Sequence, residues 1–303
     1  MLEVSFLKQK FKNPLVLASG ILGVTGASMA KVVREGAGGV TMKSVTVEKI
    51  EGNPNPVMVG EDTYFLNAVG LPGPGIKAAL PELEKFKKLS DGVLIGSIYG
   101  RTVEEFAKAT EQICKAPLDF LEIDISCPHA THLYKKPFAH DTKLIEKITK
   151  LTKEKANVPI SMKLSPNTWN ITEFAKAAEA AGADAITAVN TVSGMAINAE
   201  ARLPVLANKV GGVSGPALKP IALKAVWDIS QAVKIPVIGT GGVTYGRDAM
   251  EMLMAGATLV GVGSAFYYRG PKALALIAQE MEEFMKKEGI KKIKDIIGAA
   301  HEK

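Results

Sequence analysis

The chain has 303 residues, of which 47% are hydrophobic and 22% charged, a composition typical of a globular protein. Its two cysteines are too few for a disulfide framework or a four-cysteine metal or iron–sulfur site. The net charge of +6 is mild and Lys and Glu are interleaved, which argues against nucleic acid and favours an anionic small molecule. No apolar run is long enough to span a membrane and no signal peptide begins the chain, so we expect a cytoplasmic protein without a membrane partner.

Eight short apolar runs predict the strands of a parallel sheet, because such strands are buried on both faces. In chain order they are Leu15–Ser19, Gly39–Ser44, Val93–Tyr99, Phe120–Ser126, Ile160–Ser165, Ala185–Thr191, Val237–Gly242 and Leu259–Ala265. Helical periodicity predicts a helix after each strand. These segments are Met29–Glu35, Ile76–Leu89, Val103–Cys114, Lys143–Lys155, Thr172–Ala181, Pro220–Val233, Asp248–Ala255 and Lys272–Lys287.

The alternation of eight strands and eight helices favours a single (β/α)8 TIM barrel of the α/β class. Gly36, Gly182 and Gly256 each follow a helix directly, where glycine adopts the left-handed conformation that ends it. An open doubly wound sheet would need a GxGxxG turn after its first strand, and the chain has none there. No linker interrupts residues 1–303, so we expect one domain.

Three connections are long: residues 46–75 after the second strand, 127–142 after the fourth and 192–219 after the sixth. Loops that follow barrel strands lie at the C-terminal face, where barrel enzymes carry their chemistry. Long loops of this kind are commonly binding loops or lids. The helical tail, with residues 293–300, is amphipathic and is expected to pack on the barrel.

Glycines end the seventh strand, in Thr240-Gly241-Gly242-Val243, and the eighth, in Val262-Gly263-Ser264-Ala265. A third glycine-rich segment is Gly211-Gly212-Val213-Ser214-Gly215. Loops after these two barrel strands commonly bind phosphate through bare backbone N–H groups. The alternative is that the glycines only make tight turns. Two such motifs in register favour a phosphate site.

Lys43 and Lys163 interrupt apolar strands, and Ser44, Asn190 and Thr191 stand at strand ends. A lysine buried there is costly unless an anion or another acceptor receives it. Each lysine could instead extend to solvent at the rim. Because there are two of them, we favour an electron-rich ligand in the mouth of the barrel.

Cys127 stands at the tip of the fourth strand, followed by Pro128 and His129. A cysteine there acts as a nucleophile or general base when its pKa falls below the usual value of about 8.5. Cys114 lies in an amphipathic segment and fits the alternative of a small buried hydrophobe.

Three histidines, His129, His132 and His140, lie in the loop after Cys127. They have no carboxylate or thiolate set beside them, so we predict no metal site. Asp141 directly precedes the next helix and is expected to cap it.

A set of motifs along most of the chain is specific in its order and spacing, although each motif alone is weak. The set is Ala18-Ser19-Gly20, Met42-Lys43-Ser44-Val45-Thr46 with Glu51-Gly52-Asn53-Pro54, Leu66-Asn67-Ala68-Val69-Gly70-Leu71, Ser126-Cys127-Pro128, Val189-Asn190-Thr191, Gly211-Gly212-Val213-Ser214-Gly215-Pro216 and Thr240-Gly241-Gly242. In these motifs the chain resembles the dihydroorotate dehydrogenases, and most of all the catalytic subunit of the class 1, type B enzymes.

The resemblance implies an FMN-containing barrel that oxidises (S)-dihydroorotate to orotate in pyrimidine (UMP) biosynthesis. It implies that FMN takes a hydride from C6 of the substrate while Cys127 removes a proton from C5. By the family pattern, the residues at FMN would be Ser19, Lys43, Ser44, Ser97, Asp124, Lys163, Val189, Gly215, Gly241, Gly242, Gly263 and Ser264. The residues at the substrate would be Lys43, Asn67, Ala68, Val69, Gly70, Leu71, Asp124, Asn190 and Thr191.

The resemblance also implies a partner, since type B enzymes pass electrons to a separate subunit with FAD and an iron–sulfur cluster, and then to NAD. This chain has too few cysteines to hold that cluster itself. We therefore expect a homodimer or a heterotetramer with such a subunit. Direct use of fumarate or another acceptor stays open.

The chain departs from the family pattern at Asp124 and His129, where the family usually has Asn. An amide can donate a hydrogen bond to a flavin or pyrimidine, whereas an ionised carboxylate only accepts. Cys-Pro-His also resembles dihydropyrimidine dehydrogenase, which acts on uncharged uracil, but the segment 67–71 favours a substrate with a carboxylate. A phosphate-binding barrel lyase or isomerase without flavin, and a non-catalytic barrel, are the alternatives from other classes.

Overall fold

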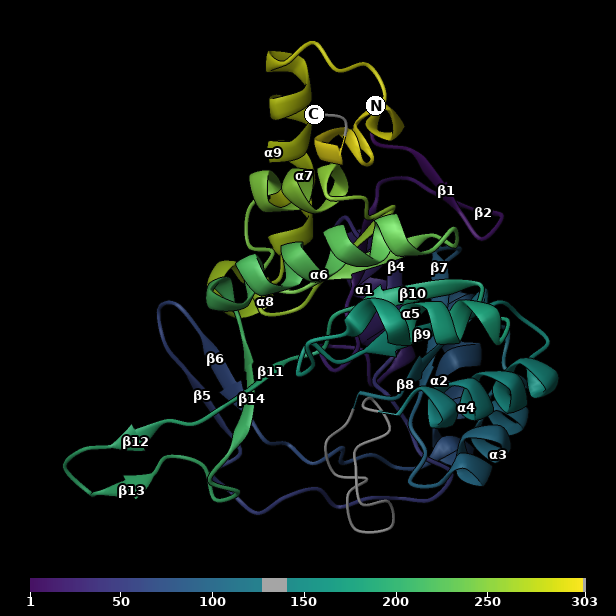
Figure 1. Cartoon of the computed structure of the whole chain (residues 1–303), viewed down its shortest axis with the longest axis vertical. Helices are drawn as coiled ribbons and strands as arrows, with labels where there is room; N and C mark the ends of the chain where they lie inside the picture. Colours follow the sequence, from purple (N-terminus) through teal and green to yellow (C-terminus); the bar gives the residue numbers. More distant parts are fainter. Residues whose placement is uncertain (127–140, 302–303) are drawn as a thin grey trace.

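The computed structural model describes residues 1–126 and 141–301 of the chain. Within them, eight parallel strands close into a barrel in which each strand pairs with the next barrel strand, and the last with the first (Figure 1). The strands are β3 (Leu15–Leu17), β4 (Gly39–Thr41), β7 (Val93–Ile98), β8 (Phe120–Asp124), β9 (Ile160–Leu164), β10 (Ala185–Ala188), β15 (Val237–Thr240) and β16 (Leu259–Val262). The predicted (β/α)8 barrel is confirmed, and each strand lies inside a predicted apolar run.

Helices follow the barrel strands, and all of them except the short α8 overlap the predicted helical segments. They are α1 (Gly26–Arg34), α2 (Ile76–Leu89), α3 (Val103–Ile113), α4 (Thr142–Lys155), α5 (Ile171–Ala180), α6 (Lys219–Ala232), α7 (Gly246–Met254), α8 (Ala265–Arg269) and α9 (Ala273–Lys287). The short helix α8 was not predicted. No helix in the described part of the chain is long and apolar enough to cross a membrane.

Local signals set the ends of these helices as the sequence predicts. Asp141 caps α4, because its Oδ1 accepts hydrogen bonds from the backbone N–H groups of Lys143 (2.9 Å) and Leu144 (3.2 Å). Gly36, Gly182 and Gly256 follow α1, α5 and α7 with φ of 109°, 100° and 106°. This left-handed backbone lets the chain leave each helix and enter the next strand.

A hairpin that the sequence analysis missed closes the N-terminal end of the barrel. Strands β1 (Val4–Phe6) and β2 (Gln9–Phe11) pair antiparallel and place two phenylalanines in the core. The ring of Phe6 lies 5.6 Å from that of Phe120, at the start of β8, and 6.4 Å from that of Phe11. We call this aromatic cluster of Phe6, Phe11 and Phe120 the floor of the barrel.

Two of the predicted long loops contain strands that join into one antiparallel sheet, in the order β11-β14-β6-β5. We call it the upper sheet; it comprises β5 (Met58–Gly60), β6 (Phe65–Asn67), β11 (Val192–Gly194) and β14 (Gly211–Ser214). A two-stranded ribbon, β12 (Ile197–Asn198) with β13 (Leu203–Pro204), projects from it (Figure 1). The prediction of enlarged loops was incomplete, because these segments are structured by pairing with each other.

The C-terminal segment differs from its prediction as a helical tail. It contains two short 3₁₀ turns, Ile293–Ile296 and Ala299–His301, separated by Gly298 with φ of 75°. Ile293 and Ile296 are buried, and the ring of His301 packs edge-on against Trp227 of α6. The segment therefore packs on the outside of the barrel, as expected, although it does not form a continuous helix.

Candidate active site

Three serine side chains meet where three neighbouring barrel strands approach the mouth. Ser19 follows β3, Ser44 follows β4 and Ser97 lies in β7. The Oγ atoms of Ser19 and Ser44 are 2.9 Å apart, and those of Ser44 and Ser97 are 2.8 Å apart. Each hydroxyl can donate and accept, so the three form a continuous hydrogen-bonded chain. The structure thus brings together three of the predicted cofactor residues.

A buried ion pair lies between the neighbouring strands β8 and β9. The Nζ atom of Lys163 is 3.3 Å from Oε1 of Glu122, and their side chains are 7% and 5% exposed. Loss of hydration lowers the pKa of Lys163, but the carboxylates of Glu122 and Asp124 outweigh it, so that the pKa is raised overall. Lys163 is therefore a cation held in place by the protein itself.

Lys43 lies at the mouth in a different situation. Its side chain is half-buried after β4, and within residues 1–126 and 141–301 its Nζ atom has no hydrogen bond or ion pair. Burial lowers its pKa from 10.5, and the more distant charge of Asp124 opposes this only in part. The described part of the fold gives this cation no bonded counter-charge, which an anionic ligand would supply.

Asp124, Ser126 and Asn190 are joined by hydrogen bonds across the mouth. Oδ1 of Asp124 accepts from the backbone N–H of Ser126 (3.1 Å) and also bonds the hydroxyl of Ser126. The Oγ atom of Ser126 is 2.5 Å from Nδ2 of Asn190, which follows β10. Asp124 and Asn190 were predicted site residues, and Ser126 is the group that connects them.

The upper sheet places Asn67 and Thr191 near each other, although 124 positions separate them in the sequence. Asn67 ends β6 and pairs with Gly212 of β14, to whose carbonyl its Nδ2 donates at 3.4 Å. A Cβ atom on Gly212 would lie 2.1 Å from Oγ1 of Thr191, so a glycine is required for this close approach.

The predicted substrate loop, Ala68 to Leu71, is shaped by Asn53. The backbone N–H of Asn53 donates to the carbonyl of Val69 (3.1 Å), and its Nδ2 donates to the carbonyl of Ala68 (2.8 Å). Gly70 and Leu71 have φ of 77° and 55°. Within the described residues, the N–H groups of Val69, Gly70 and Leu71 donate to no acceptor. Neighbouring bare N–H groups of this kind bind anions.

The glycines after β15 and β16 leave a second set of bare donors. The N–H groups of Gly242, Gly263 and Ser264 donate to no acceptor in the described part of the chain. Gly242 has φ of 75°, and a Cβ there would lie 2.4 Å from the backbone N of Lys219. Above Gly263 there is room, since its nearest neighbours lie 3.7 Å from a Cβ position. This arrangement suits a phosphate group.

The other predicted cofactor residues lie around these donors. Val189 is buried and donates its N–H to the carbonyl of Thr240 (2.8 Å), which ties the end of β10 to β15. Gly241 has φ of 134° and Gly215 has φ of 85°. A Cβ on Gly215 would lie 2.9 Å from the hydroxyl of Tyr268, so only glycine fits there without displacement.

Of the two cysteines, only Cys114 lies among the residues that the structure describes. Cys127, the predicted base, lies outside the described residues, so its role stays a prediction. Cys114 is buried at the end of α3, and burial raises the pKa of its thiol. A thiol of this kind is unreactive, as expected for a small buried hydrophobe.

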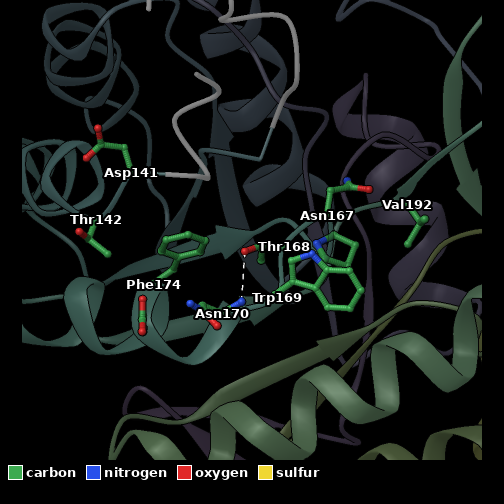
Figure 2. A pocket seen from close by; sticks show the side chains of 10 residues that line it. Asp141, Thr142, Asn167, Thr168, Trp169, Asn170, Phe174 and Val192 are labelled. Atoms are coloured by element: carbon green, nitrogen blue, oxygen red, sulfur yellow. Dashed lines mark hydrogen bonds between the residues drawn. The ribbon is translucent and has the colours of Figure 1, made fainter. Parts of the chain in front are cut away.

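A pocket of about 830 Å³ opens between the end of β9 and the first turns of α4 and α5 (Figure 2). Its lining residues are Asp141, Thr142, Pro166, Asn167, Thr168, Trp169, Asn170, Glu173, Phe174 and Val192. Trp169 is fully exposed at its edge. Among the residues that the structure describes, no predicted cofactor or substrate residue lines this pocket. The pocket adjoins the predicted site, because Nδ2 of Asn167 in its lining donates to the carbonyl of Thr191 (3.0 Å).

Three residues that shape the site had no predicted role in it: Glu122, Ser126 and Asn53. Glu122 and Ser126 stand two residues before and after Asp124, and alternate residues of a strand point to the same face. The register of the barrel pairs Asp124 with Lys163 on the next strand. A carboxylate on the inward face beside a predicted inward lysine was the signal for Glu122. The signal for Asn53 and Ser126 was their place in the motifs that carry the family resemblance.

The fold and the polar mouth place the chain among the (β/α)8 barrels that carry a site at the C-terminal face. A family model described as dihydroorotate dehydrogenase matches residues 1–285. The dihydroorotate dehydrogenase B (NAD(+)) catalytic subunit of Methanosarcina mazei is 48% identical over 97% of this chain and 93% of its own length. The same subunit of Methanocaldococcus jannaschii is 42% identical over 100% and 99%. A crystal structure of DHODH from Eimeria tenella in complex with ferulenol superposes with a TM-score of 0.86, over 100% of this chain and 89% of that one, at 22% identity.

The chain therefore belongs to the dihydroorotate dehydrogenase family, and the predicted resemblance to the class 1, type B catalytic subunit is confirmed. It is a flavin-dependent oxidoreductase that acts on a CH–CH bond. This excludes the non-flavin lyase or isomerase and the non-catalytic barrel.

Proposed function

We propose that this chain oxidises (S)-dihydroorotate to orotate in pyrimidine biosynthesis and that its flavin is FMN. Two features together support the choice of substrate: the side chain of Lys43 and the backbone segment from Val69 to Leu71. Among the described residues, Lys43 is a half-buried cation without a bonded counter-charge, and the segment offers N–H groups without acceptors. A pyrimidine with a carboxylate supplies both with an anion, whereas uncharged uracil supplies neither.

The residues at the mouth fit FMN rather than a flavin without phosphate. The N–H groups of Gly242, Gly263 and Ser264 offer the donors that a phosphate needs, and the room above Gly263 leaves space for it. Lys163 and the chain of Ser19, Ser44 and Ser97 would bind polar edges of the ring. When bound, FMN supplies the acceptor for the two electrons that leave the substrate.

The chain's own part in the chemistry is to hold the substrate and to take up a proton. We expect Cys127 to remove the proton from C5, and a thiol must be partly deprotonated to do so. The rate should therefore rise with pH until the thiolate forms. A rate that is flat from about pH 6 to 9, with chemistry still limiting, would remove Cys127 from this role.

The decisive experiment compares substrates on the purified, flavin-loaded protein. Anaerobic addition of dihydroorotate should bleach the flavin absorption, and orotate should shift the spectrum of the oxidised flavin. Dihydrouracil and uracil should do neither at the same concentration. If uracil shifts the spectrum and orotate does not, the substrate is an uncharged pyrimidine and this proposal is wrong.

We propose further that electrons leave through a separate subunit that carries FAD and an iron–sulfur cluster, within a heterotetramer. The relatives are named as catalytic subunits of an NAD(+) enzyme, and the two cysteines here cannot form a cluster site. The isolated chain should reduce artificial acceptors with dihydroorotate but not NAD. Fast reduction of NAD, or of fumarate, by the isolated chain would contradict the need for a partner.

A further inference from the structure

Asp124 stands where the family usually has an amide, and its hydrogen bonds link two strands that are not neighbours. Strand β9 lies between β8, which ends at Asp124, and β10, which precedes Asn190. Ser126 bridges the two through its hydroxyl, and all three residues are buried or half-buried. We call this set of Asp124, Ser126 and Asn190 the mouth relay.

The chemistry of the groups fixes the direction of every hydrogen bond in the mouth relay. A carboxylate only accepts, so the single hydroxyl hydrogen of Ser126 goes to Asp124. The Oγ atom of Ser126 can then only accept, and it receives Nδ2–H of Asn190 at 2.5 Å. On the other side, Oδ1 of Asn190 accepts the N–H of Thr191 at 2.8 Å. The amide of Asn190 is therefore held in one of its two orientations.

This orientation has a consequence for a ligand in the mouth. One N–H of the Asn190 amide is used by Ser126, and the second has no acceptor within the described residues. An acceptor oxygen of a ligand, as on a carbonyl or carboxylate, suits that N–H. If residue 124 were an amide, the Ser126 hydroxyl could instead donate to Asn190, and only the N–H of Thr191 would then favour the present orientation of the amide.

We propose that Asp124 and Ser126 are positioning residues that hold Asn190 with its N–H toward an acceptor oxygen of the pyrimidine substrate. This rests on the proposed function, because it needs the pyrimidine to bind beside Asn190. Asp124 acts on the ligand through Ser126 and Asn190, whereas the family's amide at this position can bind directly. The negative charge of Asp124 is tolerated because it acts on Lys43 and Lys163 at the same time.

The test is a double-mutant cycle on the flavin-loaded protein with Asp124→Ala, Ser126→Ala and the pair together. The dissociation constant of orotate is measured by isothermal titration calorimetry. Each single variant should weaken orotate binding about tenfold, the size expected for one oriented hydrogen bond. The pair should be no weaker than Ser126→Ala alone, because without the hydroxyl Asp124 no longer reaches Asn190. Effects that multiply to about a hundredfold would overturn the mouth relay.

Two further measurements separate positioning from damage to the fold. In Asp124→Ala, KM for dihydroorotate should rise by the same factor as the dissociation constant while kcat stays within about threefold. Ser161→Ala is the matched control, since Ser161 is also buried inside the barrel but bonds Thr187 (2.9 Å), and it should leave orotate binding within about twofold. A wild-type protein that does not bind orotate would overturn the proposed function and the mouth relay with it. Wild-type binding with a multiplicative cycle would overturn the mouth relay alone.

Discussion

At the N-terminal end of the barrel Lys87 and Lys153 bond Asp119 and Asp184 at 2.7 and 2.5 Å, whereas at the C-terminal end Lys43 has no bonded counter-charge in the described part of the chain. Each aspartate at the N-terminal end also accepts a hydrogen bond from a backbone N–H at the start of a neighbouring strand. Those N–H groups belong to Leu94 (2.7 Å) and Ile160 (2.8 Å).

The difference teaches how one barrel separates stability from binding. At the N-terminal end, each lysine is paired with an aspartate and the rings of the aromatic floor pack against one another. These groups therefore need no ligand. At the mouth, the Lys163–Glu122 pair is satisfied, but Lys43 and the bare N–H groups have no partner among the residues that the structure describes. Unsatisfied groups reduce the stability of the free protein and strengthen the binding of an anion.

The largest effect on stability is expected from Lys163→Met, which leaves the carboxylate of Glu122 buried and unpaired. The free energy of unfolding should fall by about 3–5 kcal/mol. The pKa of Lys163 is raised above its ordinary value, so this contribution is complete at neutral pH and is lost only as the pH rises through that raised pKa. Urea unfolding followed by circular dichroism measures it.

The control for this prediction is the double variant Lys163→Met with Glu122→Leu. It removes the orphaned charge and should recover much of the lost stability, because a buried ion pair can be replaced by apolar groups at little cost. If the double variant is less stable than Lys163→Met, the loss comes from packing and not from the unpaired carboxylate.

The next largest effect is expected at the floor. Phe6→Ala removes a fully buried ring from the aromatic cluster and should reduce the free energy of unfolding by about 3 kcal/mol. The orotate dissociation constant should stay within about twofold, because the floor lies at the opposite end of the barrel from the mouth. A variant that unfolds earlier and also loses orotate affinity would show that the two ends are coupled.

The same contrast explains what the sequence could predict. Barrel strands such as Ile160–Leu164 are buried along their whole length, so composition alone reveals them. The strands of the upper sheet have three or four residues, of which only Leu66 is buried and the others are at best half-buried. They exist because Leu66 of β6 pairs with Val213 of β14, far away in the sequence. No local pattern carries that information.

The site was predictable to a similar extent. Lys43 and Lys163 could be predicted as site residues because a charge in an apolar run is unusual. The sequence pattern does not indicate which of the two lysines has a partner. That depends on the register between strands, which sets Asp124 beside Lys163 and Glu122 within reach of its ammonium group. The hairpin with Phe6 was missed because its three-residue strands resemble a loop with scattered apolar residues.

A smaller effect, of opposite sign, is expected from Lys43→Met. Removing a desolvated cation that has no bonded partner in residues 1–126 and 141–301 should raise the free energy of unfolding of the ligand-free protein by about 0.5–2 kcal/mol. Orotate binding should become much weaker at the same time. A loss of both stability and binding would mean that Lys43 has a stabilising role in the free protein.

The pH dependence of this gain follows from the lowered pKa of Lys43. The folded state disfavours the charged form, so the wild type is penalised below the lowered pKa and recovers as the pH rises toward 10.5. The stability difference between Lys43→Met and the wild type should therefore shrink over that interval. A difference that stays constant with pH would show that the charge is not its cause.

The smallest effect is expected from Lys153→Met at the N-terminal end. The side chains of Lys153 and Asp184 are 39% and 29% exposed, so water screens their attraction. The free energy of unfolding should fall by about 0.2–1 kcal/mol, and the difference should shrink in high salt. Asp184 keeps its hydrogen bond from the N–H of Ile160, so it is not left unsatisfied as Glu122 is in Lys163→Met. If Lys153→Met costs as much as Lys163→Met, burial does not distinguish the two ends, and the division between a self-sufficient floor and a ligand-dependent mouth fails.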